Sequence, residues 1–157
     1  MTISLHPLDR RDAGRFAHIA VRPGQERFAG TVDAALVEPE ATVDLHEIRE
    51  AGGVVGLFKI DRAYHLRHDF AQADHLGLRG VILDQKRQGR GLGTAAMTAL
   101  KGYLPPAYPG KARVWLTVNM ANPPAIAAYR KAGFVETGDI WPHGSAGPQL
   151  IMFMPLG

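Results

Sequence analysis

The segment QKRQGRGLGTAAM, residues 85–97, decides the fold of this chain. It follows an apolar run that ends at Asp84, places glycine at 89, 91 and 93, and then enters an alanine-rich stretch with helical spacing. A glycine-rich loop before a helix exposes backbone N–H groups, and the helix macrodipole adds partial positive charge there. Glycine also leaves room for an anion to approach the backbone. The segment therefore predicts a phosphate-binding site at the start of a helix.

Two common phosphate-binding motifs do not fit. A dinucleotide fingerprint needs G-x-G-x-x-G, and its third glycine position holds Thr94. A nucleoside triphosphate loop needs G-x-x-x-x-G-K-[ST], but the pair Gly110 and Lys111 has Pro105 at the upstream glycine position and Ala112 after the lysine. Both of these ligand classes are therefore excluded by spacing.

The rest of the chain predicts a mixed α/β sheet in the order β-α-α-β-β-β-α-β-α-β-β, because helices alternate with strands only in the second half. We expect two helices within residues 9–37, broken at Pro23 and Gly24, and a helix from Leu92 that the pair Pro105 and Pro106 stops. After Asn122 a helix begins with two prolines. The expected strands are residues 2–8, 42–50, 54–62, 75–84, 113–119, 134–140 and 148–156.

Length and composition predict one folded domain, residues 1–157. No window reaches the roughly 18 uncharged apolar residues of a membrane span, so no membrane association is expected. The absence of cysteine excludes disulfides, thiolate metal sites and a cysteine nucleophile. The first residues lack a basic segment followed by an apolar one, so we expect no secretory signal and a cytoplasmic location.

Charge is unevenly distributed along the chain. Residues 76–131 carry nine basic side chains against one acid, Asp84, whereas residues 26–50 carry seven acids against Arg27 and Arg49. We expect one part of the protein to attract anions and another to attract cations, unless both segments are simply solvated faces. Nucleic acid is not expected as a partner, because the basic residues are not interleaved with aromatics in a known reading motif.

The spacing Q/R-x-x-G-x-G/A fits the opening segment, with Gln88, Gly91 and Gly93 at its defined positions. A second block, TVNMANPPAIAAYRKAGF at residues 117–134, contains N-x-x-N-x-x-A, then a tyrosine and K-x-G-F. In these blocks, in their order and in the interval between them, the chain resembles the GCN5-related N-acetyltransferase family. The resemblance covers about the last half of the chain.

This resemblance implies a mostly antiparallel central sheet whose fourth and fifth strands splay apart, with acetyl-CoA bound in the gap. The pantetheine arm would pair with the backbone of Ile82 and Leu83, and Asn122 would both cap a helix and contact the arm. The basic side chains of Lys86, Arg87 and Arg90 suit nearby phosphates, unless they are simply solvated loop residues. The pyrophosphate would lie on Gln88, Gly89, Arg90, Gly91, Leu92, Gly93 and Thr94.

Acetyl transfer to an amine needs an unprotonated nucleophile and a proton for the departing thiolate. By resemblance Tyr129, with an ordinary pKa of about 10, is that acid, although its spacing alone also suits a core aromatic. Many relatives carry a glutamate base in the fourth strand, but here that position is Gly77. His75, with an ordinary pKa of about 6.5, is the candidate replacement; otherwise water removes the proton or the amine binds neutral. His65 and His68 lack carboxylates beyond Asp69, so no metal is expected.

The acceptor is predicted from weaker signals. VRPGQERFAGTVDAAL, residues 21–36, is similar to the opening helices of the bacterial diamine and polyamine acetyltransferase branch. We therefore expect a small, polyamine-like primary amine, with Gln25, Phe28 and Glu47 lining its pocket. Aminoglycosides, a peptide N-terminus and a lysine side chain stay open, as does a non-catalytic acetyl-CoA sensor or regulatory module. Relatives often form homodimers, and we expect the same of this chain.

Overall fold

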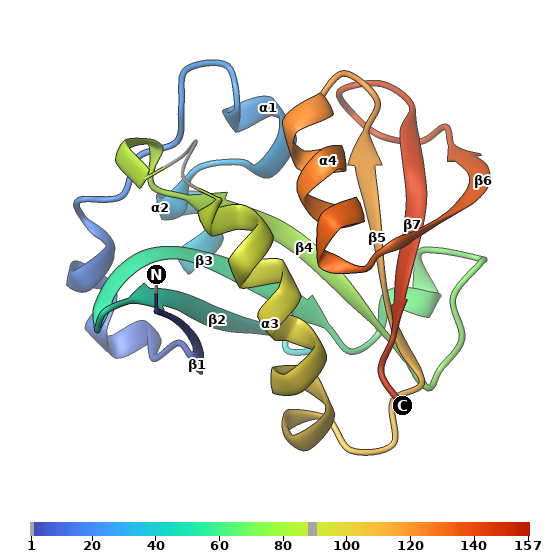
Figure 1. Ribbon diagram of the computed structural model, residues 1–157, viewed down its shortest axis with the longest axis horizontal. Helices are drawn as coiled ribbons and strands as arrows, with labels where there is room; N and C mark the ends of the chain where they lie inside the picture. Colours follow the sequence, from blue (N-terminus) through green and yellow to red (C-terminus); the bar gives the residue numbers. More distant parts are fainter. Residues whose placement is uncertain (1, 88–90) are drawn as a thin grey trace.

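A computed structural model describes residues 2–87 and 91–157, and a single seven-stranded sheet lies at its centre (Figure 1). The strand order is β1-β2-β3-β4-β5-β7-β6, which confirms the predicted mixed α/β class. The strands are β1 (Ile3–Pro7), β2 (Val43–Glu50), β3 (Gly53–Asp61), β4 (His75–Leu83), β5 (Arg113–Asn119), β6 (Val135–Trp141) and β7 (Gln149–Pro155). The helices are η1 (Arg10–Phe16), α1 (Glu26–Ala29), α2 (Val32–Leu36), η2 (Tyr64–Leu66), η3 (Gln85–Arg87), α3 (Leu92–Ala107) and α4 (Pro123–Ala132).

Strands β4 and β5 are parallel neighbours that separate after a short paired stretch. The pairing joins only residues His75–Gly77 of β4 to residues Arg113–Trp115 of β5. Beyond Gly77, β4 keeps its antiparallel pairing with β3, and β5 keeps its antiparallel pairing with β7. The two halves of the sheet therefore open between them a gap at the carboxyl ends of β4 and β5, and the expected splay is confirmed.

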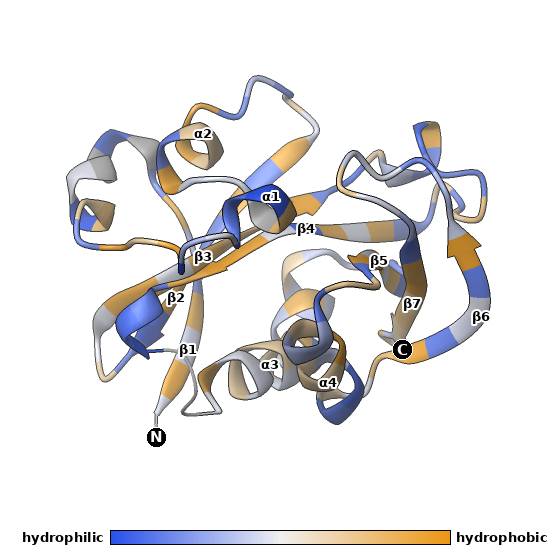
Figure 2. Cartoon of the chain, turned by 90° about the horizontal axis from the view of Figure 1, so that it is seen from above, coloured by the Kyte–Doolittle hydropathy of each residue, from blue (hydrophilic) through white to orange (hydrophobic). Residues whose placement is uncertain are grey.

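Helices cover both faces of the sheet (Figure 2). On one face lie α3 and α4, and α3 buries Leu92, Ala96, Met97, Leu100 and Leu104 in the larger core cluster. On the other face η1 and α2 pack on β3 and β4 through a second cluster. Burying each large aliphatic side chain contributes about 1.5–3 kcal/mol, so both faces anchor the strands that border the gap.

The N-terminal helices differ from the expected pair. The first segment forms the 3₁₀ helix η1, and the second divides at Gly30 into two short helices. Thr31 starts α2 by accepting a hydrogen bond from the Ala34 amide, so a new cap lies directly after the first helix. This local capping ends α1 after a single turn.

Helix α3 also runs beyond the predicted stop. Pro105 and Pro106 lie in its last turn, which extends to Ala107, and the Tyr108 amide donates to the Leu104 carbonyl. Their missing N–H groups remove hydrogen bonds from that turn. Tertiary contacts compensate, because the hydroxyls of Tyr103 and Tyr108 both bond to the buried imidazole of His46 on β2.

Candidate active site

A cavity of about 660 Å³ occupies the gap between β4 and β5. Most of its walls come from α1 and the loop before it, the η2 region, β4, β5, the first turns of α3 and the length of α4. The loop between β6 and β7 adds Ser145 and Ala146. The cavity thus meets both faces of the sheet, with α3 and α4 on one side and α1 on the other (Figure 2).

One end of the cavity is the N-terminus of α3. Gly91 is the N-cap residue with φ 76°, a left-handed conformation that side chains disfavour, and its carbonyl accepts from the Ala95 amide. Gly91, Leu92, Gly93 and Thr94 all line the cavity. A helix N-terminus presents unpaired N–H groups and partial positive charge, which suits a pyrophosphate. Of the predicted loop, Gln88, Gly89 and Arg90 lie outside the described residues.

The backbone of β4 forms one wall. The carbonyl of Ile82 lies against Gly56 of β3, where an added Cβ would be 2.3 Å from that oxygen. Neighbouring residues of a strand direct their backbone groups to opposite sides, so Val81 and Leu83 direct theirs toward the gap. Val81 and Leu83 line the cavity, whereas Ile82 is buried in the second core cluster. The expected backbone contact therefore fits Leu83 and Val81 and does not fit Ile82.

Helix α4 and its N-cap also line the cavity, and two of their polar side chains, Tyr129 and Asn122, are candidates for contact with a ligand. Tyr129 lies against Phe134 with its ring edge-on, and burial raises the pKa of its hydroxyl to about 12. The hydroxyl is therefore protonated at neutral pH and can donate a proton. Asn122 occupies the N-cap position of α4, yet its side chain makes no capping hydrogen bond and faces the cavity. Its amide is free to bind a ligand, and these donors fit the arm of a coenzyme A thioester.

Comparison with known proteins identifies the family. The model of the acetyltransferase (GNAT) family matches residues 26–134, more than half of the chain. This chain belongs to the GNAT family. GNAT proteins are acetyl-CoA-dependent N-acetyltransferases, and this chain is therefore an enzyme of that class. No curated protein matches the chain in sequence.

Solved structures share the GNAT fold with low sequence identity. AAC(6')-Ib in complex with paromomycin and acetyl-CoA is 19% identical, with a TM-score of 0.79 over 99% of this chain and 94% of that one. A spermidine N-acetyltransferase SpeG chimera from Vibrio cholerae and hSSAT is 18% identical, with a TM-score of 0.70 over 99% and 96%. The ribosomal-protein-S18-alanine N-acetyltransferase from Escherichia coli is 21% identical, with a TM-score of 0.66 over 99% of this chain and 95% of that one.

The position of the family glutamate is filled in this GNAT chain by a neighbouring ring. A Cβ added at Gly77 would lie 1.9 Å from Cδ1 of Tyr64, so only glycine fits beside that ring. Tyr64 lines the cavity, and burial raises the pKa of its hydroxyl. The imidazole of His68 stacks on it at 3.7 Å and also lines the cavity. Sequence reasoning assigned no site role to Tyr64 or His68; the only signal was the pair His65 and His68.

His75 lies away from the cavity, at the paired end of β4 and β5. Its ring is buried, and its Nδ1 accepts hydrogen bonds from Trp115 Nε1 at 2.8 Å and from the Gln72 amide at 3.1 Å. Burial lowers the pKa of His75. Its place therefore does not suit the expected role of base, because it is not among the residues that line the cavity.

Two of the three residues expected to line the acceptor pocket lie at the cavity, and one does not. Gln25 and Phe28 line the cavity. Glu47 does not, because it is fully buried between two arginines: Arg15 Nη2 lies 2.7 Å from its Oε2, and Arg49 also pairs with it. An acceptor would have to displace both partners, so Glu47 holds the N-terminal segment on β2 instead.

The basic residues expected near the phosphates and the acidic residues of segment 26–50 are not placed as the sequence suggested. Lys86 and Arg87 do not line the cavity, and Arg87 lies 3.8 Å from Glu50. The acidic stretch is largely neutralised by basic side chains from outside it. The pairs are Glu38 with Lys59, Glu40 with Arg67 and Asp44 with Arg62.

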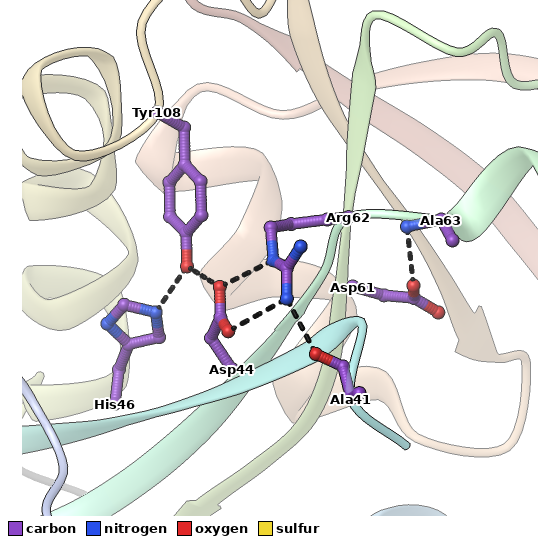
Figure 3. Close-up of polar contacts among 7 residues, drawn as sticks. All are labelled: Ala41, Asp44, His46, Asp61, Arg62, Ala63 and Tyr108. Carbon is purple, nitrogen blue, oxygen red and sulfur yellow. Dashed lines mark hydrogen bonds and ion pairs between the residues drawn. The ribbon is translucent and has the colours of Figure 1, made fainter.

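A second polar network lies outside this site, between β2 and the end of α3 (Figure 3). The Tyr108 hydroxyl donates to Asp44 at 2.7 Å and lies 2.8 Å from His46 Nε2, and Arg62 binds Asp44 and the Ala41 carbonyl. Burial lowers the pKa of His46 to about 4, so the ring is neutral at pH 7. The network borders a separate cavity of about 560 Å³.

Metal-binding groups and membrane-spanning helices can be assessed for the described part of the chain. Among the side chains that the structure describes, no three from histidine, aspartate or glutamate are grouped as a metal site. Within residues 2–87 and 91–157 no helix combines the length and apolar character needed to cross a membrane.

Proposed function

We propose that the chain transfers the acetyl group of acetyl-CoA to a primary amine by direct attack in a ternary complex, and that residues 1–157 act as one domain. The observation that carries this proposal is the cavity in the strand splay, which the N-terminus of α3 and the Tyr129 hydroxyl both border. Bound acetyl-CoA would supply the reactive thioester. A homodimer and a cytoplasmic location stay predictions.

The residues of the cavity have separate tasks in this proposal. Amides at Gly91 to Thr94 hold the pyrophosphate, and the backbone of Val81 and Leu83 with the Asn122 amide aligns the arm. Tyr129, whose pKa of about 12 keeps it protonated, donates its proton to the departing thiolate. Gln25 and Phe28 line the opening through which the acceptor enters.

The charge of the cavity bears on the acceptor. Among its described lining residues there is no aspartate or glutamate, while Arg22, Arg27, Arg79 and Lys131 are basic. Arg79 is paired with Asp61, but within the described chain Arg22 and Arg27 have no carboxylate partner. A polycationic acceptor would meet net positive charge here. We therefore propose a primary amine without a second cationic centre in place of the polyamine-like acceptor that the sequence suggested.

Thiol release from acetyl-CoA tests this function. With a panel of primary amines, we expect release to depend on the amine and to fall about 100-fold or more in kcat for Tyr129→Phe. Tyr103→Phe is the matched control, because that tyrosine bonds to His46 away from the cavity. Calorimetric binding of coenzyme A without release across the panel would instead support the sensor, and no binding of either acetyl-CoA or coenzyme A would refute both.

A further inference from the structure

We propose that His68 is the catalytic base, with Nε2 accepting the proton from the ammonium group of the acceptor. This inference rests on the proposed acetyl transfer and names the group in that site that completes it. His68 belongs to the connection between β3 and β4 and lines the same cavity as Tyr129.

An acceptor that enters in its protonated form needs such a group before it can react. A primary alkyl amine has a pKa of about 10 and enters at pH 7 as an ammonium ion that cannot attack a carbonyl. The described lining of the cavity contains no carboxylate, and its arginines and lysine are already protonated. Burial raises the pKa of both Tyr64 and Tyr129, so their hydroxyls hold their protons. His68 is the one side chain among those described there that can accept a proton at neutral pH.

Its hydrogen bonding selects the tautomer that leaves Nε2 basic. Nδ1 lies 3.2 Å from the backbone carbonyl of Tyr64, and a carbonyl only accepts, so Nδ1 carries the hydrogen. In the neutral ring Nε2 then has an unshared electron pair. In the part of the chain that the structure describes, Nε2 has no hydrogen-bond partner.

Packing fixes the ring in this orientation. The imidazole lies 3.7 Å from the Tyr64 ring with an interplanar angle of 6°, and Trp141 and Phe70 pack beside it at 4.8 and 5.5 Å between centroids. The Tyr64 ring is itself immobilised by its close approach to Gly77. A rigid ring with one fixed hydrogen bond is preorganised for proton transfer, since little reorientation is needed.

The surroundings of His68 keep its ring neutral before it reacts. Burial is the main cause that lowers the pKa of His68, and Arg79 on β4 and Arg67 beside η2 lower it further. The Tyr64 carbonyl and Asp61 on β3 act in the opposite direction. Asp61 is paired with Arg79 at 3.3 Å, so its effect is partly cancelled. The ring is therefore available as a base above about pH 6.5.

Protons and bonds balance in the resulting step. Nε2 takes one proton from the ammonium group, and the freed nitrogen forms a bond to the thioester carbonyl carbon. The carbon–sulfur bond breaks, and the thiolate takes the proton of the Tyr129 hydroxyl. The nitrogen gives its second proton to the Tyr129 phenolate, and His68 releases its proton to water, so one proton leaves per turnover.

The test is the pH profile of kcat/KM for butylamine in wild type and His68→Asn. Asparagine can keep the hydrogen bond to the Tyr64 carbonyl but cannot act as a base. We expect a wild-type plateau from below pH 6.5 to about pH 9, whereas the variant rises about tenfold per pH unit because only neutral amine reacts. At pH 7 the variant should be slower by about 100-fold. His65→Asn is the control, because His65 does not line the cavity.

A second acceptor separates this proposal from the proposed function. An alkoxyamine is unprotonated at pH 7 and needs no base to become a nucleophile, so His68→Asn should acetylate it at nearly the wild-type rate. Added imidazole should restore butylamine turnover in His68→Gly.

Wild-type turnover with an unchanged pH profile in His68→Asn would overturn the role of His68 alone. Absence of turnover in wild type with every amine would overturn the proposed function. Unaltered binding of coenzyme A by calorimetry would show that the variants are folded.

Discussion

The absence of a side chain at position 77 shapes the candidate site. Because Gly77 has no Cβ, the Tyr64 ring lies directly over the β4 backbone, and His68 stacks on that ring. Tyr64 and Thr117 of β5 both line the cavity, so the ring lies on β4 at the point where the two strands begin to separate. One glycine thus determines where the cavity ends and what its wall is made of.

Replacing Gly77 with alanine should therefore disturb both stability and the site. The new Cβ would lie 1.9 Å from Tyr64 Cδ1, and displacing the ring should lower the free energy of unfolding by about 1–3 kcal/mol. Gly102→Ala is the control, because Gly102 is exposed within α3 with nothing within 4 Å of its added Cβ. That change should stabilise by about 0.5–1 kcal/mol. Urea unfolding measures both, and equal effects would contradict the role given to Gly77.

At the scale of elements, α3 is held at both ends by different means. Its N-terminus borders the cavity through Gly91 and Gly93. Its last turn, weakened by two prolines, is fastened to β2 through the bonds of Tyr103 and Tyr108 with His46. Because Tyr108 donates to Asp44, it must accept from His46 Nε2, and Nδ1 then accepts from Tyr103. This chain of bonds requires a neutral imidazole.

Stability should therefore depend on pH through His46. Its pKa falls from about 6.5 in the unfolded chain to about 4 in the folded one, so the unfolded state binds more protons between these values. The stabilisation is complete above pH 6.5 and is lost as pH falls toward 4, by about 3 kcal/mol in total. Urea unfolding between pH 7 and 4 should show this slope in wild type and in exposed His143→Gln. The slope should be weaker in His46→Phe; an unchanged slope there would contradict the assignment.

At the scale of the whole molecule, charge is sorted by burial and pairing. Acidic side chains of residues 26–50 near β2 and β3 form ion pairs with basic residues. Glu47, for example, pairs with Arg15 and Arg49. The cavity keeps the excess of basic side chains. The protein should therefore attract the anionic phosphates of acetyl-CoA and discriminate against polycationic acceptors.

The matched pair putrescine and butylamine tests this discrimination, since the two differ only in a second amine. We expect kcat/KM at low ionic strength to be lower for putrescine, because its second ammonium group is repelled by Arg22 and Arg27. Added salt should reduce the difference in kcat/KM between the two amines, because it screens the repulsion. The substitution Arg27→Gln should reduce the same difference. A preference for putrescine that weakens with salt would restore the polyamine-like acceptor.

Local features of the chain were readable from sequence alone. The glycine spacing before α3, the prolines that open α4 and the alternation of the strands depend on residues close together in sequence. Element order follows from them, as does a helix N-terminus suited to an anion. The resemblance to the family, and not local spacing, implied that Tyr129 and Asn122 lie at the coenzyme site, and both line the cavity.

Only the tertiary structure decided which partners meet across the sheet. Strand register places Glu47 between two arginines and His75 against Trp115, although both looked available in sequence. The fold of the connection between β3 and β4 brings the ring of Tyr64 to Gly77 and the imidazole of His68 into the cavity. Spacing along a chain determines helices, strands and caps, because these depend on near neighbours. Burial, ion pairing and tautomer depend on residues far apart in sequence, so they exist only once the sheet has formed.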